Sequence, residues 1–173
     1  MRRCLGMLLV FCMGGCGSSD PVGVVEPAPD PTGAMVSVNA ADFNAYLVDA
    51  FRTYQTVNVM NAEFGSIAQG WSGGVVSRYW TRQFMSNLIS RLETLQLQVR
   101  DIRPYDHELR RIHDRYEQGL TTFHEAFLAF VNQIDFPTTE GIEGVNLLIF
   151  RGNKRMDEFQ LMLSNLAGRQ IQF

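Results

Sequence analysis

The feature that most constrains the fold is a helical repeat of apolar residues, which runs through most of the chain after residue 39. The last stretch shows it best, because apolar or small residues recur there in alternating steps of three and four: Ile142, Val145, Ile149, Gly152, Met156, Phe159, Leu163 and Leu166. This spacing places one apolar stripe along one face of an α-helix. No stretch alternates with the two-residue period of a half-buried strand. The sequence therefore predicts an all-α protein.

Three earlier segments repeat the pattern and bring the number of predicted helices to four. The first stripe is Phe43, Tyr46, Leu47, Ala50, Phe51, Tyr54 and Val57; the second is Val76, Trp80, Phe84, Leu88, Leu92, Leu95, Val99 and Ile102; the third is Tyr105, Leu109, Ile112, Tyr116, Leu120, Phe123, Phe127, Phe130 and Ile134. Four helices with short connections favour an antiparallel up-down-up-down four-helix bundle. We assign residues 39–173 to this helical bundle domain.

Local signals indicate where the helices begin and end. Asn39 is a suitable N-cap for the first helix, and Thr138 or Thr139 for the fourth. Gly168 is a plausible C-terminal stop. Gly152 falls on the apolar stripe of the fourth helix, where a missing side chain lets a neighbouring helix approach closely; the alternative is a tolerated glycine that costs about 1 kcal/mol.

A glycine-rich stretch separates the first two predicted helices, with glycines at Gly65, Gly70, Gly73 and Gly74. We interpret it as a loop that leaves Trp71 accessible. Exposed tryptophans are favoured anchors of protein interfaces, so Trp71 is our candidate partner contact. The alternative is that Trp71 folds back and plugs the end of the bundle, as large aromatic side chains often do.

The N-terminus has the organisation of a signal peptide. Arg2 and Arg3 precede an apolar stretch at residues 5–13 that is too short to span a bilayer, and this stretch ends in Met13-Gly14-Gly15-Cys16. Here the chain resembles bacterial lipoproteins, whose signals end in a small-residue box closed by the lipidated cysteine. The box usually has leucine and then alanine or serine where this sequence has Met13 and Gly14. Residues 1–15 are then the signal peptide.

The resemblance implies that Cys16 carries the lipid, with palmitate among its acyl chains, and that the anchor makes the membrane a partner. It also implies the bacterial cell envelope, and the outer membrane in particular, because Gly17 is not the aspartate that retains lipoproteins at the inner membrane. The alternative is an ordinary secretory signal cut near Gly17 or Ser19. Four of the six prolines lie in residues 16–38, which we expect to form an extended tether that holds the domain off the membrane.

The residue composition and the spacing of the candidate catalytic residues argue against catalysis. All three cysteines lie within the first sixteen residues, so the domain contains no thiolate that could act as a nucleophile or bind a metal. His107 and His113 are six residues apart, which points them to different helix faces, and neither a Glu-x-x-His repeat nor a Gly-x-Ser-x-Gly elbow occurs. We therefore expect no catalytic residues, no metal and no cofactor. The charged residues 100–115 are expected to form a solvated, self-paired helix tip, with an anionic ligand site as the alternative.

Charge excludes one further class. The formal net charge is −3, and removal of Arg2 and Arg3 with the signal peptide takes it to −5, which is unsuited to nucleic-acid binding. The expected function is a membrane-anchored envelope lipoprotein whose helical bundle acts as a protein-binding or structural module. The alternative is a carrier of a hydrophobic ligand or of non-covalent haem, because the chain offers haem-ligand types at Met60, Met85, Met156, Met162, His113 and His124.

Overall fold

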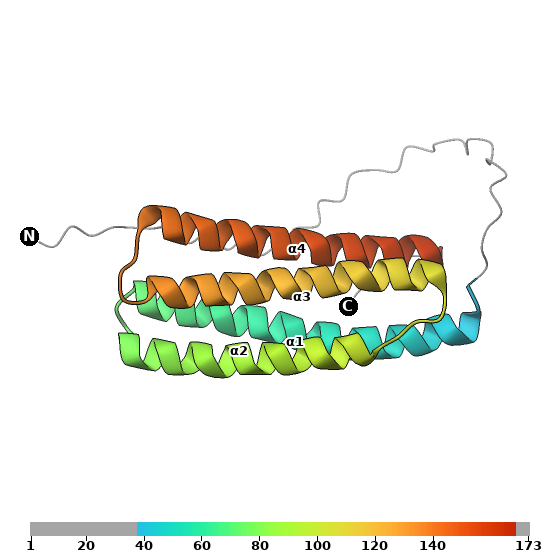
Figure 1. The fold of residues 1–173 in the computed structure, drawn as a ribbon, viewed down its shortest axis with the longest axis horizontal. Helices are drawn as coiled ribbons and strands as arrows, with labels where there is room; N and C mark the ends of the chain where they lie inside the picture. Colours follow the sequence, from blue (N-terminus) through green and yellow to red (C-terminus); the bar gives the residue numbers. More distant parts are fainter. Residues whose placement is uncertain (1–37, 169–173) are drawn as a thin grey trace, which may run out of the picture.

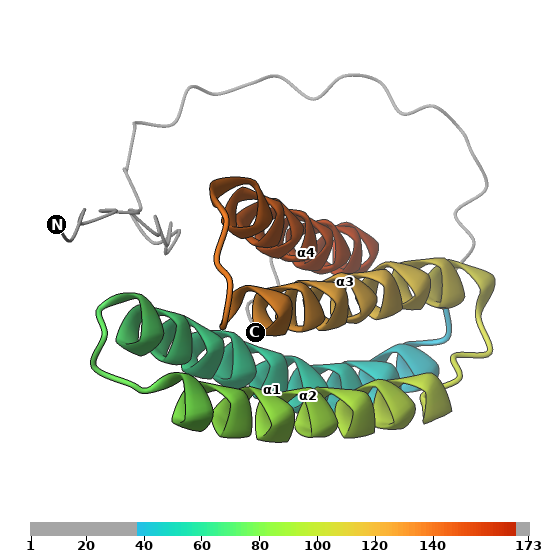
Figure 2. The ribbon, with the colours of Figure 1, turned by 60° about the vertical axis from the view of Figure 1, so that its left-hand side comes forward.

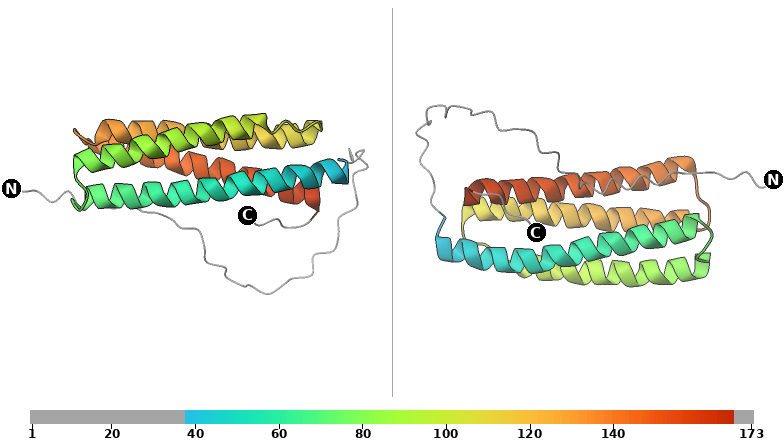
Figure 3. Two further views of the ribbon diagram at one scale, coloured as in Figure 1. Left: turned by 90° about the horizontal axis from the view of Figure 1, so that it is seen from below. Right: turned by 180° about the vertical axis from the view of Figure 1, so that it is seen from behind.

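The computed structural model describes residues 38–168, and these form four α-helices in a bundle (Figure 1). The helices are α1 (Ala40–Ser72), α2 (Arg78–Asp101), α3 (His107–Gln133) and α4 (Thr139–Ala167). Each helix runs antiparallel to the one before it, and the four lie side by side along their length (Figures 1 and 3). The predicted all-α, up-down-up-down bundle is confirmed.

The helix ends lie where local side-chain chemistry favours them. The N-cap residues are Asn39, Ser77, Asp106 and Thr138, and each accepts a hydrogen bond from a backbone N–H of the first turn that would otherwise have no partner. Gly168 ends α4 with a φ of +63°, a left-handed conformation that favours glycine. The predicted caps at Asn39 and Thr138 and the predicted stop at Gly168 are confirmed.

The predicted loop at residues 65–74 is wrong for most of its length, because α1 continues through it to Ser72. Gly65 is buried inside α1, and a Cβ at Gly70 would lie 2.7 Å from a methyl carbon of Val76. The missing side chain at Gly70 thus gives Val76 room to fold back against the helix. The true turn is short and depends on Gly74, whose φ is +71°.

Side chains from all four helices fill the core. Its largest fully buried members are Phe64, Tyr116, Phe123, Phe127, Phe130 and Phe159. Rings stack across helices: Phe64 of α1 on Phe127 of α3 and Tyr116 of α3 on Phe159 of α4, each with centroids 4.7 Å apart, and Tyr54 of α1 on Phe159 at 6.1 Å. Such aromatic pairs add about 0.5–1.5 kcal/mol each beyond the area they bury.

Helix α4 packs closely on α3 but not on α1. The Cα atoms of α3 and α4 approach within 8 Å of one another, whereas those of α1 and α4 do not (Figure 2). Two glycines permit the close approach: a Cβ at Gly152 would lie 2.6 Å from the Phe123 ring, and one at Gly119 would lie 2.7 Å from the Met156 sulfur. Close packing at Gly152, expected from the sequence, is confirmed; the matching role of Gly119 was not expected.

The buried face of α2 differs from the predicted stripe at its first two turns. Thr81 and Met85 are buried there, while Trp80 and Phe84, which the repeat placed in the core, are exposed. Trp80 and Phe84 are both apolar, whereas Thr81 is polar, so the apolar repeat selected the pair that the structure exposes. Tyr105, the first residue of the predicted third stripe, is also exposed, because it lies in the connection before α3 rather than in the helix.

Candidate functional site

Exposed apolar side chains gather at the end of the bundle where α1 meets α2 and α3 meets α4. We call this set the aromatic end and define it as Val75, Tyr79, Trp80, Phe84 and Phe136. Val75 and Phe136 lie in the two connections and are 85% and 83% exposed. The two connections lie at the same end of the molecule in Figure 1. We take the aromatic end as the candidate contact surface, because exposed apolar patches are common at sites of protein interaction.

The N-terminus of α2 positions the three rings of this surface. Ser77 caps the helix and accepts a hydrogen bond from the backbone N–H of Trp80. Trp80 and Phe84 are one turn apart and stack with centroids 6.1 Å apart, while Tyr79 meets Trp80 edge to face at 5.3 Å. The three rings therefore form one continuous aromatic surface on a regular helix.

An ion pair ties the two halves of the aromatic end together. Arg82 of α2 pairs with Asp135, which directly precedes Phe136 in the α3–α4 connection. Both partners are partly exposed, so the pair contributes at most about 1 kcal/mol. Its structural effect is to hold the connection that carries Phe136 beside the first turns of α2.

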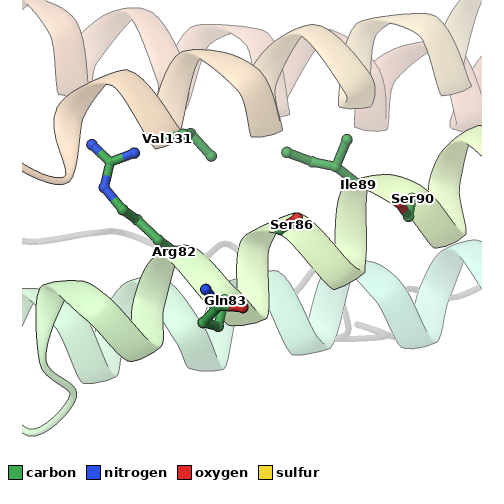
Figure 4. Close-up of a pocket in the computed structure, with 6 residues that line it drawn as sticks. All are labelled: Arg82, Gln83, Ser86, Ile89, Ser90 and Val131. Carbon is green, nitrogen blue, oxygen red and sulfur yellow. The ribbon is translucent and has the colours of Figure 1, made fainter.

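A cleft of about 340 Å³ lies next to this ion pair, between α2 and α3 (Figure 4). It is lined by Arg82, Gln83, Ser86, Ile89, Ser90 and Val131. Figure 4 shows Arg82 and Ile89 extending from α2 toward α3. The lining combines one paired cation, small hydroxyls and two aliphatic side chains, and it offers no general base within reach of a nucleophile.

Trp71, the predicted partner contact, lies in the last turn of α1 rather than in a flexible loop. Its ring is partly buried and meets the ring of Phe130 edge to face, with centroids 5.3 Å apart. A partner contact at Trp71 stays a prediction, but the argument that a mobile glycine loop exposes the ring no longer holds. The exposed tryptophan of the domain is Trp80, which sequence reasoning placed in the core.

The three histidines of the chain do not converge on one point. His107 is exposed at the start of α3, His113 is buried with Nδ1 3.2 Å from the hydroxyl of Tyr46, and His124 lies 3.1 Å from a carboxylate oxygen of Glu93. Within residues 38–168, no three His, Cys, Asp or Glu side chains lie together as metal ligands. Cys16, the predicted site of lipidation, lies outside the described residues, as does nearly all of the predicted tether.

The charged segment at residues 100–115 is partly self-paired. Arg111 forms an ion pair with Glu108 at 2.9 Å, and Arg110 donates to the backbone carbonyl of Tyr105 at 3.1 Å. Arg100 instead lines a small cleft together with Glu117. These contacts agree with a solvated helix tip, at the opposite end of the bundle from the aromatic end (Figure 1).

Two further findings bear on the class of protein. None of the four described helices combines the length and hydropathy needed to cross a membrane. Comparison with models of protein families, with curated proteins and with solved structures found no match to this chain. The class of this protein is therefore described by its own structure: it is a four-helix bundle with an exposed aromatic end.

Proposed function

We propose that this protein is a membrane-anchored lipoprotein of the bacterial envelope whose helical bundle acts as a protein-binding or structural module, with the aromatic end as its contact surface. The anchor is proposed at Cys16 from the lipoprotein-like box that precedes it. The observation that carries the contact surface is the set of solvent-facing rings at the start of α2. Tryptophan and tyrosine dominate the energetics of protein interfaces because their large rings lose little conformational entropy on binding.

The arrangement of the helices suits this role. Helix α1 begins at one end of the bundle, where the chain arrives from residues 16–38, and the aromatic end lies at the other (Figure 1). The 33 residues of α1 span about 50 Å. An anchor before α1 would therefore present the aromatic end at a distance from the membrane, in a position to meet a partner protein.

Site-specific crosslinking in the native envelope tests this proposal. A photo-reactive residue at position 80 should yield an adduct with a partner protein, whereas one at position 161 should not. Leu161 is the matched control because it is 61% exposed, against 56% for Trp80, but lies in the half of α4 that is remote from the aromatic end. Equal adducts at both positions, or none at position 80, would remove the support for this surface.

Alanine variants of the two tryptophans separate binding from stability. We expect Trp80→Ala to weaken crosslinking from position 79 with little change in the free energy of unfolding, because the ring is exposed. Trp71→Ala should lower that free energy by about 2–3 kcal/mol, since the variant removes a partly buried ring from Phe130. If Trp71→Ala reduces the crosslinking and Trp80→Ala does not, the partner contact is assigned to Trp71, the residue predicted from the sequence.

The carrier of a hydrophobic ligand or haem is the second candidate. It is supported by the burial of Met60, Met85 and Met156 in the same core as His113. Against it, Nδ1 of His113 already contacts Tyr46, and Met156 fills the space above Gly119. A visible absorption band in the purified protein, lost in His113→Gln, would favour the carrier over the binding module.

A further inference from the structure

The side chain of His113 links two helices that are far apart in sequence. Its Nδ1 lies 3.2 Å from the hydroxyl of Tyr46, 67 positions earlier, and both side chains are buried, that of His113 with only 5% of its surface exposed. Tyr46 lies in the second turn of α1. This contact therefore fastens the beginning of α1, the part that continues into the predicted tether, to α3.

The other ring nitrogen of His113 faces acceptors. Glu117, one turn along α3, places a carboxylate oxygen 3.5 Å from Nε2, and the backbone carbonyl of Val99 in α2 also faces the ring. Within the described residues Nε2 has no hydrogen-bond partner at normal distance. Since its neighbours are acceptors, the neutral ring is best placed with its proton on Nε2. Nδ1 is then free to accept the hydrogen bond from Tyr46.

The surroundings of the ring oppose a positive charge overall. Burial lowers the pKa of His113, and this effect outweighs the opposite influences of Glu117, the Val99 carbonyl and Asp114. The Tyr46 hydroxyl does not ionise to balance a charge on His113. Burial raises the pKa of this hydroxyl far above its ordinary value, and Tyr116, Glu117 and Asp114 add smaller contributions in the same direction. The hydroxyl stays protonated and stays a donor.

We propose that His113 is a proton-sensitive latch, which holds the first turns of α1 in the bundle while its ring is neutral and releases them when the ring is protonated. Protonation puts a hydrogen on both ring nitrogens, so Nδ1 can no longer accept from Tyr46. It also places a charge in a buried site, which favours an opened state in which water solvates the ring.

The direction of the pH effect follows from linkage. The ring binds a proton more readily in the opened state, where its pKa is near 6.5, than in the closed one. The latch is therefore fully closed above pH 6.5 and weakens as the pH falls below that value toward the lowered pKa of the closed state. Released residues of α1 would extend from 1.5 Å to about 3 Å per residue and so lengthen the tether in acid.

Hydrogen exchange on the full chain tests the latch. At pH 5, compared with pH 7.5 and corrected for intrinsic exchange rates, amides at positions 44–50 should exchange faster, while those in the middle of α3 should not. Each unit between the two pKa values corresponds to a tenfold change in the opening equilibrium. His113→Gln should remove this pH dependence, whereas the control His124→Gln, at a histidine paired with Glu93 near the surface, should retain it.

Glu117→Gln supplies a second test, which does not require the His113 variant to fold. Loss of the carboxylate that favours the protonated ring lowers the pKa of His113 in the closed state further, while its pKa in the opened state stays near 6.5. Exchange at positions 44–50 should therefore still begin to quicken near pH 6.5, but its total increase on acidification should be larger than in the unaltered chain. The proposal is overturned if exchange at positions 44–50 has the same pH profile in the unaltered chain and in His113→Gln. It is equally overturned if Glu117→Gln makes the total increase in exchange on acidification smaller or leaves it unchanged.

Discussion

Gly152 and Gly144 lie in the same helix but in opposite surroundings, one crowded and one open. A Cβ at Gly152 would lie 2.6 Å from the Phe123 ring, whereas a Cβ at Gly144 would meet no atom within 4 Å. Both lie inside α4, where alanine is favoured over glycine by about 1 kcal/mol in helix propensity. Only at Gly152 does this gain compete with a steric conflict between α4 and α3.

We therefore expect Gly144→Ala to stabilise the protein by about 0.5–1 kcal/mol. Gly152→Ala should destabilise it by about 1–2 kcal/mol, because overpacking of a filled core costs about 1–3 kcal/mol and exceeds the gain in propensity. Urea denaturation of the two variants measures both values. A Gly152→Ala protein as stable as the Gly144→Ala protein would show that the Phe123 ring moves aside freely.

At the scale of helices, the N-cap of α4 is the clearest case of a boundary set by local chemistry. The Thr138 hydroxyl accepts from the Gly141 N–H at 3.0 Å, and the side-chain carbonyl of Gln133 accepts from the Thr138 N–H at 3.0 Å. Thr138→Ala should lower the free energy of unfolding by about 1 kcal/mol, while Thr138→Ser, which keeps the hydroxyl, should change it far less. Equal losses in thermal unfolding of both variants would show that the threonine methyl, and not the cap, stabilises the turn.

The sequence predicted those helix boundaries that depend on neighbouring residues, and missed features that depend on packing at a distance. Asn39, Thr138 and Gly168 act on backbone groups within four residues, so their roles can be recognised locally. From the sequence alone, Gly70 is expected to break the helix. Its role in making room for Val76 becomes visible only when the position of Val76 is known. In α2, Thr81 is buried and the neighbouring Trp80 is exposed, although tryptophan is usually the more buried of these two residue types. Only the packing of α2 shows which of the two faces the core.

The same limit applies to the candidate surfaces. Trp80 was predicted to be buried, and Trp71 to be either an accessible contact or a plug at the end of the bundle. The structure makes Trp80 the more exposed of the two and packs Trp71 partly against the core. The contact between Tyr46 and His113 joins positions 67 residues apart, which no periodicity reveals. The separations of the three histidines along one helix did indicate that their side chains would lie on different faces or levels.

For the whole molecule, attachment through Cys16 is the most direct prediction. Cys16→Ser should abolish metabolic labelling with palmitate and should release the protein from the membrane fraction, because the acyl chains supply the affinity for the bilayer. The bundle should keep its helical circular dichroism, since residue 16 lies outside all four helices. Labelling that persists in the variant would assign the lipid to another residue or show that the chain is not lipidated.

The antiparallel arrangement of α1 has a mechanical consequence. The chain enters the bundle at Ala40 and the aromatic rings begin at Tyr79, at opposite ends of the molecule (Figure 1). Tension between an anchor and a bound partner would therefore pull along the axis of α1. In that direction the packing of α1 against α2 and α3 is loaded in shear along its whole length, so many contacts resist together. A pull across the axis would instead peel the helix away one turn at a time.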